Sequence, residues 1–282
     1  MKKLIPALCM LLVAACLMGT STYAWFAANT QVSASGMEVK ALSSGGLAIA
    51  SYTNNSGAKT PPIADNFKSA YTLNFDATKG LVDYVQGADA IKPVSYNNDK
   101  AAAKWFTAAA ANADDGKAAE GLTEVTSDPN AYRKAFYYQV KSLRDGYTSE
   151  VYVSDVTVDG VSTSAVLDKS LRVAIVTAEA SFIFAPVHVA QQENEKDLVY
   201  ATGIEDGAFT TGKTNLLRLT SYDADETVIF AALGTAAQDV TVYVYYEGED
   251  PNCKSANATN IDTLKVTFKL NVAGETQIVA AG

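Results

Sequence analysis

The chain has 282 residues, a formal net charge of -9 at pH 7, 48% hydrophobic residues and 19% charged residues. Seven prolines and this moderate share of charge argue against a wholly disordered chain. The acidic balance argues against binding to nucleic acid or to anionic membrane surfaces, because both repel a negatively charged protein.

The first 24 residues have the pattern of a cleaved secretion signal. Lys2 and Lys3 form a short basic region, residues 4–18 are mostly apolar, and a stretch of small residues ends at Ala24. An apolar run of about fifteen residues is shorter than the roughly twenty that a membrane-spanning helix needs. We therefore expect a signal peptidase to cut between Ala24 and Trp25, and the mature chain to be extracellular or on the cell surface of a bacterium.

The same segment offers an alternative. Val13-Ala14-Ala15-Cys16 resembles a bacterial lipobox, in which the Cys16 thiol is lipidated and becomes the N-terminus. The protein would then be a monomeric surface lipoprotein or adhesin anchored through Cys16. Exposed tyrosines such as Tyr243 and Tyr245 would be its binding residues.

Residues 25–34 are suited to a β-strand but precede the first obvious strand of the domain. The positions of one parity, which would share a face, are Phe26, Ala28, Thr30, Val32 and Ala34. After Ser35-Gly36, an alternating run at 37–41 is expected to continue as a strand into 47–50. A loose N-terminal strand can fold back on its own sheet, or it can fill a groove in a neighbouring subunit. The second arrangement is head-to-tail and does not close, so it yields a filament.

Residues 52–133 are richer in Asn, Ala, Asp and Gly than the remainder. Within them, 99–112 is alanine-rich with Trp105 and Phe106 at its centre, which predicts a helix whose aromatic rings dock on the sheets. We expect this region to be a helix-containing insertion in a sandwich domain of residues 42–282. A separate subdomain is the alternative.

Alternating apolar and polar residues dominate the second half of the chain. The runs with strand character are 134–143, 148–159, 170–185, 226–233, 239–247 and 263–272. A change of parity after Val153 predicts a bulge near Ser154-Asp155. Many half-buried strands, Gly-containing turns and no long crossover helices predict a mainly β fold, an antiparallel sandwich or jelly roll.

The residues that catalysis usually requires are scarce. The single histidine, His188, follows Pro186 at the end of an apolar run, and one imidazole excludes a site that needs two. Without residues 1–24, Cys253 is the one cysteine left, so no disulfide forms within the chain. No Gly-x-Ser-x-Gly turn marks a nucleophile, and several acids near Cys253 would raise its thiol pKa. We expect no enzyme activity and no cofactor.

Two acidic clusters are weak candidates for calcium. They consist of Asp223, Asp225 and Glu226, and of Glu247, Glu249 and Asp250. Hard cations bind several carboxylate and carbonyl oxygens. Neither spacing matches a known calcium loop, and solvated turns are the simpler interpretation of both.

Two short runs near the N-terminus carry a family resemblance. Residues 19–26 are Gly-Thr-Ser-Thr-Tyr-Ala-Trp-Phe, and residues 34–41 are Ala-Ser-Gly-Met-Glu-Val-Lys-Ala. With the polar stretch between them, they resemble the start of the TasA and camelysin family of secreted Gram-positive proteins. That family has a Gly-Thr-x-Ala-aromatic cleavage region, a polar spacer and a small-residue-Gly turn into its first strand. The resemblance ends at residue 41.

The resemblance implies a dedicated signal peptidase, a jelly-roll core and assembly into extracellular matrix fibres by donor-strand exchange. This chain departs from the family in its insertion and in Trp25-Phe26, where the family more often has one aromatic followed by Ser or Asn and Asp. Camelysin has also been classed as a metallopeptidase, but this sequence has no zinc motif that would support such an activity.

Together these features predict a secreted, non-enzymatic structural subunit of a surface or biofilm-matrix fibre. The partners would be copies of the same chain and the signal peptidase, with no nucleic acid and, after cleavage, no membrane. Residues 25–34 are the expected donor strand, within an N-terminal segment of residues 25–41. Trp25 and Phe26 would anchor it, because buried aromatic area dominates interface energetics.

Overall fold

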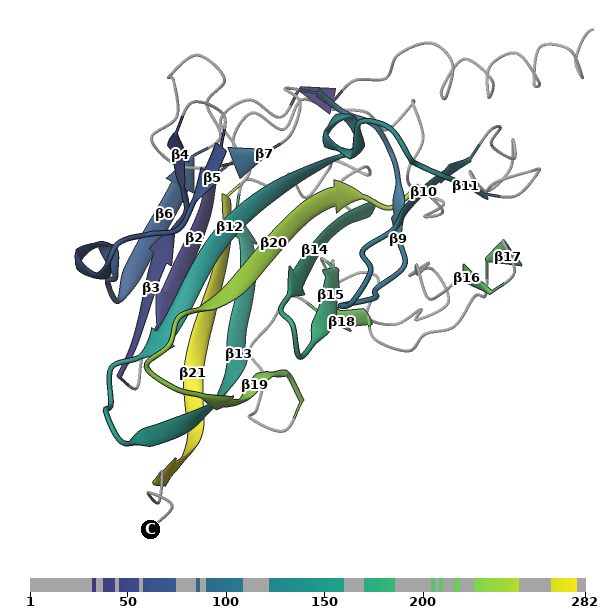
Figure 1. Ribbon diagram of the computed structural model, residues 1–282. Coiled ribbons are helices and arrows are strands. Elements are labelled where there is room, and N and C mark those ends of the chain that lie inside the picture. The colour runs from purple at the N-terminus through teal and green to yellow at the C-terminus, as the bar shows by residue number, and fades with distance from the viewer. Residues whose placement is uncertain are drawn as a thin grey trace, which may run out of the picture.

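The computed structural model describes residues 32–33, 38–43, 46–55, 58–74, 85–86, 90–108, 122–159, 170–185, 204–205, 208–209, 216–218, 226–248 and 265–277. Over these residues the chain is mainly β and most strand pairs are antiparallel, which confirms the predicted fold class. Two large sheets face each other and enclose the main core, and small sheets lie beside them (Figure 1).

The larger sheet has seven strands in the order β18-β15-β14-β20-β12-β3, with β7 also paired to β12. Their bounds are β3 (Leu47–Ser51), β7 (Val85–Gln86), β12 (Arg133–Ser142), β14 (Leu171–Val176), β15 (Ser181–Ala185), β18 (Leu216–Arg218) and β20 (Gln238–Tyr246). All pairs are antiparallel except β15 with β18. The run at 170–185 is therefore a strand pair, because β14 and β15 form a hairpin.

The second sheet has five strands in the order β19-β13-β21-β2-β6. Their bounds are β2 (Glu38–Ser43), β6 (Ala70–Asn74), β13 (Tyr147–Asp159), β19 (Val228–Leu233) and β21 (Lys265–Gln277). The register of β13 against β21 shifts between Val153 and Asp155, as the change of parity predicted. β2 runs parallel to β21, and the other pairs are antiparallel.

β2 and β3 do not form one continuous strand, contrary to the sequence expectation. β2 lies in the five-stranded sheet and β3 in the seven-stranded sheet, so the chain crosses the sandwich between them. Gly46, just before β3, has a φ of 82°, a left-handed conformation that glycine adopts without the strain a side chain would cause. The sandwich thus begins with β2 at Glu38 rather than at residue 42.

The main core consists of the inward residues of both sheets. Alternate positions of a strand face one side, so Val240, Val242 and Val244 on β20 are all fully buried. Tyr138 on β12 joins the two layers: its hydroxyl donates to the Val39 carbonyl oxygen on β2 at 2.8 Å. The Tyr138 ring also meets the Phe268 ring on β21 edge-on, with the ring centroids 5.5 Å apart.

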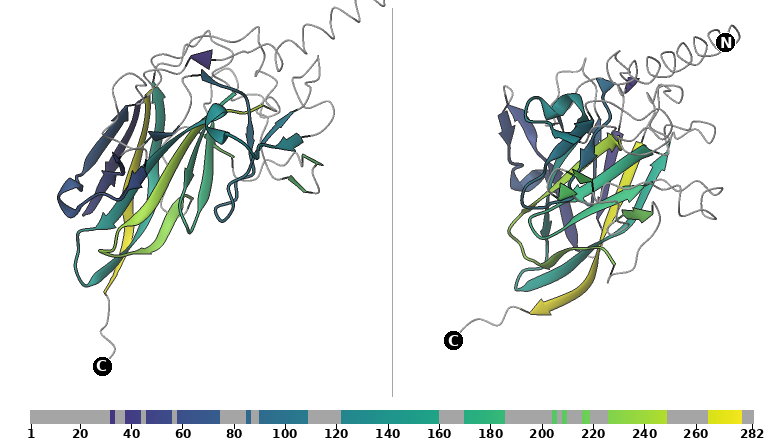
Figure 2. Two further views of the ribbon diagram at one scale, coloured as in Figure 1. Left: turned by 45° about the horizontal axis from the view of Figure 1, so that its top comes forward. Right: turned by 90° about the vertical axis from the view of Figure 1, so that its right-hand side faces the viewer.

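The helix predicted over 99–112 is wrong for the part that the structure describes. Trp105 and Phe106 lie on strand β10 (Trp105–Ala108), which is flanked by β9 (Ser95–Tyr96) and β11 (Leu122–Glu124). The alanines around them favour a helix only weakly, and burial of an aromatic residue on a strand outweighs that local preference. The insertion therefore contributes a small sheet against the seven-stranded sheet (Figure 2).

The remaining described elements are short. They are β1 (Val32–Ser33), β4 (Thr53–Asn55), β5 (Ala58–Thr60), β8 (Ala90–Ile91), β16 (Ile204–Glu205), β17 (Ala208–Phe209), and the one-turn 3-10 helices η1 (Ala64–Asn66) and η2 (Pro129–Ala131). Within the insertion, only η1 and η2 are helical among the described residues. β1 pairs with β8, β4 with β5, and β16 with β17.

Candidate functional site: an open strand edge at the end of the sandwich

The candidate catalytic and processing residues of the sequence lie mostly outside the described part of the chain. This holds for His188, Cys253, Cys16, and for the Ala24-Trp25 junction. Among the described residues, no group of three or more His, Cys, Asp or Glu side chains could hold a metal ion.

Of the six calcium candidates, the structure describes Glu226 and Glu247, whereas Asp223, Asp225, Glu249 and Asp250 lie outside the described residues. Glu226 is exposed. Glu247 is fully buried rather than on a solvated turn, and the Ser95 hydroxyl donates a hydrogen bond to its carboxylate. This contact fastens β9 to the end of β20.

Tyr243 and Tyr245 do not form the exposed binding surface expected for an adhesin. Their rings pack edge-on against the Trp105 ring, with centroids 5.1 and 5.2 Å from it, and Tyr96 stacks on Trp105 at 4.8 Å. Tyr245 is fully buried, and this burial raises the pKa of its phenol well above the usual value. The aromatic face of β20 is thus a second core that holds the β9-β10-β11 sheet in place.

A cluster that the sequence analysis missed fastens the β4–β5 hairpin. The Lys59 amine lies over the Tyr52 and Tyr137 rings, 4.1 and 4.4 Å from their centroids, and 3.9 Å from an Asp239 carboxylate oxygen. Burial lowers the pKa of Lys59. The Tyr52 hydroxyl donates to the same carboxylate at 2.5 Å. Burial, as the larger cause, and this hydrogen bond both raise the pKa of Tyr52. Cation–π contacts and a shared acid suit a structural clamp.

Of the expected donor strand, residues 25–34, the structure describes Val32 and Ser33 alone. These two residues form β1 and pair antiparallel with β8, Val32 opposite Ile91 and Ser33 opposite Ala90. Ile91 is fully buried in the main core. β1 is not a member of either large sheet. Trp25, Phe26, Ala28, Thr30 and Ala34, the other predicted polymerisation residues, lie outside the described residues.

The C-terminal end of β21 has an exposed strand edge. β21 has 13 residues, and β13 pairs with it along its whole length, whereas β2 accompanies it only from Lys265 to Leu270. Of the strands that the structure describes, none pairs with 272–277 on the side where β2 ends. Residues 273–277 are exposed. We call 272–277 the open edge; such edges are templates for pairing with another chain.

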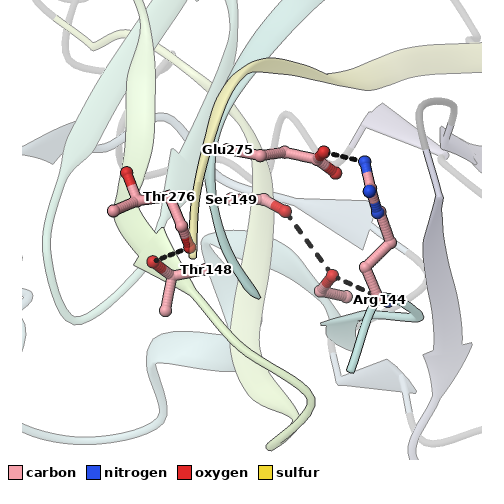
Figure 3. Close-up of polar contacts among 6 residues, drawn as sticks. Arg144, Thr148, Ser149, Glu275 and Thr276 are labelled. Atoms are coloured by element: carbon pink, nitrogen blue, oxygen red, sulfur yellow. Dashed lines mark hydrogen bonds and ion pairs between the residues drawn. The ribbon is translucent and has the colours of Figure 1, made fainter. Parts of the chain in front are cut away.

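A groove of about 560 Å³ lies beside the open edge. Its lining is Gly46, Arg144, Val272, Ala273, Gly274 and Glu275. Figure 3 shows Arg144 and Glu275 pointing toward each other across it, where they form an ion pair. The Arg144 guanidinium also lies 4.6 Å from the centre of the Tyr147 ring. This pair joins the turn between β12 and β13 to the open edge.

Two further polar contacts join the strands and the turn next to the groove. The Ser142 hydroxyl accepts from the Arg144 amide at 3.1 Å, and the Thr148 hydroxyl donates to the Thr276 carbonyl at 3.4 Å (Figure 3). An open strand edge and a groove can bind an extended peptide through backbone hydrogen bonds. The sequence predicted a strand over 263–272, whereas β21 continues to Gln277, so the predicted run ends where the open edge begins. Alternation also does not show where a pairing partner ends.

No family model, curated protein or solved structure matches the chain. Within the described residues, the structure has no helix with the length and apolar character to cross a membrane.

Proposed function

We propose that the chain is a secreted structural subunit of an extracellular fibre, of the surface or biofilm-matrix type. Copies would assemble head-to-tail as each donates its N-terminal residues 25–34, the donor segment, to a neighbour. The observation that carries the proposal is that β1, the described part of this segment, stands outside both large sheets. The sandwich already has its own first strand in β2, so the donor segment is not needed to complete it.

The sequence supports the proposal independently. The donor segment follows a secretion signal directly and has the alternation of a strand. It carries no Asp, Glu, Lys or Arg, so docking it on an acidic neighbour costs no charge repulsion. The resemblance of residues 19–41 to the start of the TasA and camelysin family points to the same mode of assembly.

The alternative, a monomeric lipoprotein anchored through Cys16, rests on the lipobox-like run alone. Tyr245 is fully buried and Tyr243 half-buried against Trp105, so they do not form the exposed binding surface that the sequence suggested for it. Intact mass of the secreted product separates the two functions: an N-terminus at Trp25 supports the fibre subunit, and a diacylglycerol on Cys16 supports the lipoprotein.

Assembly is tested by comparing two purified chains, one that begins at Trp25 and one that begins at Ser35. We expect the first to sediment as polymer and the second to stay monomeric, while their circular dichroism spectra and unfolding midpoints agree. The shorter chain lacks β1 but keeps both large sheets, so equal unfolding midpoints would assign a loss of assembly to the donor segment and not to unfolding. Equal polymerisation of both chains would overturn the proposal.

A further inference from the structure

We propose that the acceptor for the donor segment is the open edge of β21, residues 272–277, with the groove beside it. The inference rests on the proposed function and names the partner surface that the function requires. The occupant is the N-terminal segment of a second copy of this chain. Four observations lead to this edge: its position, its direction, its length and the character of its side chains.

The open edge and β1, the described part of the donor segment, lie at opposite ends of the sandwich. In Figure 1, β1 is the purple arrow at the top, and the yellow end of β21 projects at the bottom; both views of Figure 2 keep this separation. A chain that donates at one end and accepts at the other makes a heterologous contact, which repeats without closing. Stacking copies end to end therefore brings each donor segment to the next open edge.

The direction of the strands also agrees. β2 runs parallel to β21 and stops where Ser43 lies opposite Leu270. The open edge continues β21 beyond that point, so the unoccupied place lies in line with β2. If all copies in a stack have the same orientation, a donor segment that leads in the direction of its own β2 runs parallel to the neighbour's β21. It would then pair with the neighbour's β21 in the same parallel manner as β2 does, directly beyond the end of β2.

The lengths match once the pairing of β1 is taken into account. Val32 and Ser33 belong to the donor segment but pair with β8 of their own chain, so the donated residues narrow from 25–34 to 25–31. At ~3.3 Å per residue, an extended 25–31 spans about 23 Å and the open edge 272–277 about 20 Å. The β1–β8 pair would thus act as the fixed point from which the donated strand leaves.

The side chains of the two partners are compatible. A Cβ placed on Gly274 would meet no atom within 4 Å, so there is space against the backbone of the open edge. Parallel pairing sets Trp25 and Phe26 at the start of the open edge, beside Val272, which is one of the residues that line the groove of about 560 Å³. Aromatic side chains in such a groove would supply most of the contact energy.

Cysteine cross-linking tests the inference in a chain that begins at Trp25 and carries Cys253→Ser. Acceptor variants carry Ala273→Cys on the open edge, or Ala232→Cys on β19 at the other edge of the same sheet; both positions are exposed. Donor variants carry one cysteine at each of residues 26–29, because a parallel register with Trp25 beside Val272 sets Phe26 opposite Ala273. Donor and acceptor variants are mixed, oxidised and separated by non-reducing electrophoresis, and fibres are counted by electron microscopy.

We expect the yield of covalent dimers with Ala273→Cys to be at least tenfold higher than with Ala232→Cys. Among the donor variants, every second position should cross-link, because neighbouring residues of a strand face opposite sides. If fibres form but the donor cysteines do not cross-link to Ala273→Cys, or cross-link equally to Ala232→Cys, the open edge is not the acceptor. The proposed function would still hold in that case. A preparation that forms no fibres at all would overturn both.

Discussion

Two buried tyrosines differ in what their hydroxyl groups contact. The Tyr138 hydroxyl donates to the Val39 carbonyl oxygen and so links the two sheets. The Tyr245 hydroxyl is buried with no hydrogen-bond partner in the part of the chain that the structure describes. A buried polar group without a partner keeps its desolvation cost, whereas one with a partner recovers it.

Replacing each tyrosine by phenylalanine should therefore have opposite effects. We expect Tyr138→Phe to lower the free energy of unfolding by about 1–2 kcal/mol, and Tyr245→Phe to leave it unchanged or raise it by up to about 1 kcal/mol. Urea unfolding followed by circular dichroism measures both. A loss at Tyr245 as large as that at Tyr138 would show that its hydroxyl has a partner.

At the scale of elements, the chain crosses from one sheet to the other between β2 and β3 and adopts a left-handed conformation at Gly46. An alanine there would have the same φ of 82° with a side chain that this conformation disfavours. Gly274, on the open edge, has neither a positive φ nor an atom near the position of a Cβ.

The two glycines form a matched pair for mutation. Gly46→Ala should destabilise the monomer by about 1–2 kcal/mol, since its backbone would be strained. Gly274→Ala should change the monomer by less than about 0.5 kcal/mol, as expected for an open surface position. Thermal unfolding of chains that begin at Ser35 measures the monomer alone. Equal losses at the two sites would mean that the crossing does not depend on glycine.

The small β9-β10-β11 sheet is held by phenols that strongly favour their neutral form. Burial raises the pKa of Tyr96 to about 12, and it also raises the pKa of Tyr245. In the unfolded chain both phenols have a pKa of about 10. The folded state therefore binds these protons more tightly, so their contribution to stability is complete below pH 10 and is lost as pH rises toward 12.

We accordingly expect the free energy of unfolding to fall steeply above pH 10. Tyr96→Phe should weaken this dependence, because one of the protons is then absent. Urea titrations at pH 8, 10 and 11 measure the slope, and tyrosinate absorbance follows ionisation. A stability that stays flat to pH 11 would contradict the burial of these phenols.

The sequence predicted the strands whose alternation reflects burial on one face. β12, β20 and β21 place valine, leucine or aromatic residues at every second position, and the bulge near Asp155 follows from a change of parity. The helix at 99–112 was wrong because long-range packing of Trp105 outweighs alanine propensity. Alternation also looks the same in either sheet, so it did not show the crossing at Gly46.

For the proposed interface, the sequence suggests a donor segment but no acceptor. The alternation of 25–34 can be seen in consecutive residues, and its role as donor stays a prediction. The open edge instead depends on where β2 stops beside β21, two strands more than 200 residues apart in the chain. Gly46 and Arg144, which line the groove, come from two further turns and carry no local motif.

At the scale of the whole molecule, the proposed fibre subunit is a sandwich that donates a strand at one end and accepts one at the open edge of the other end. Such a subunit has two complementary surfaces at opposite ends, so its assembly would continue beyond a dimer. Fibre length should then depend on the concentration of mature chain, and every fibre should be one polar row of subunits.

Negative-stain electron microscopy of the purified chain beginning at Trp25 tests this account most directly. The account predicts unbranched fibres of constant width, and single particles of sandwich size from the chain that begins at Ser35. If both chains give only single particles even at high protein concentration, the proposed fibre assembly is contradicted.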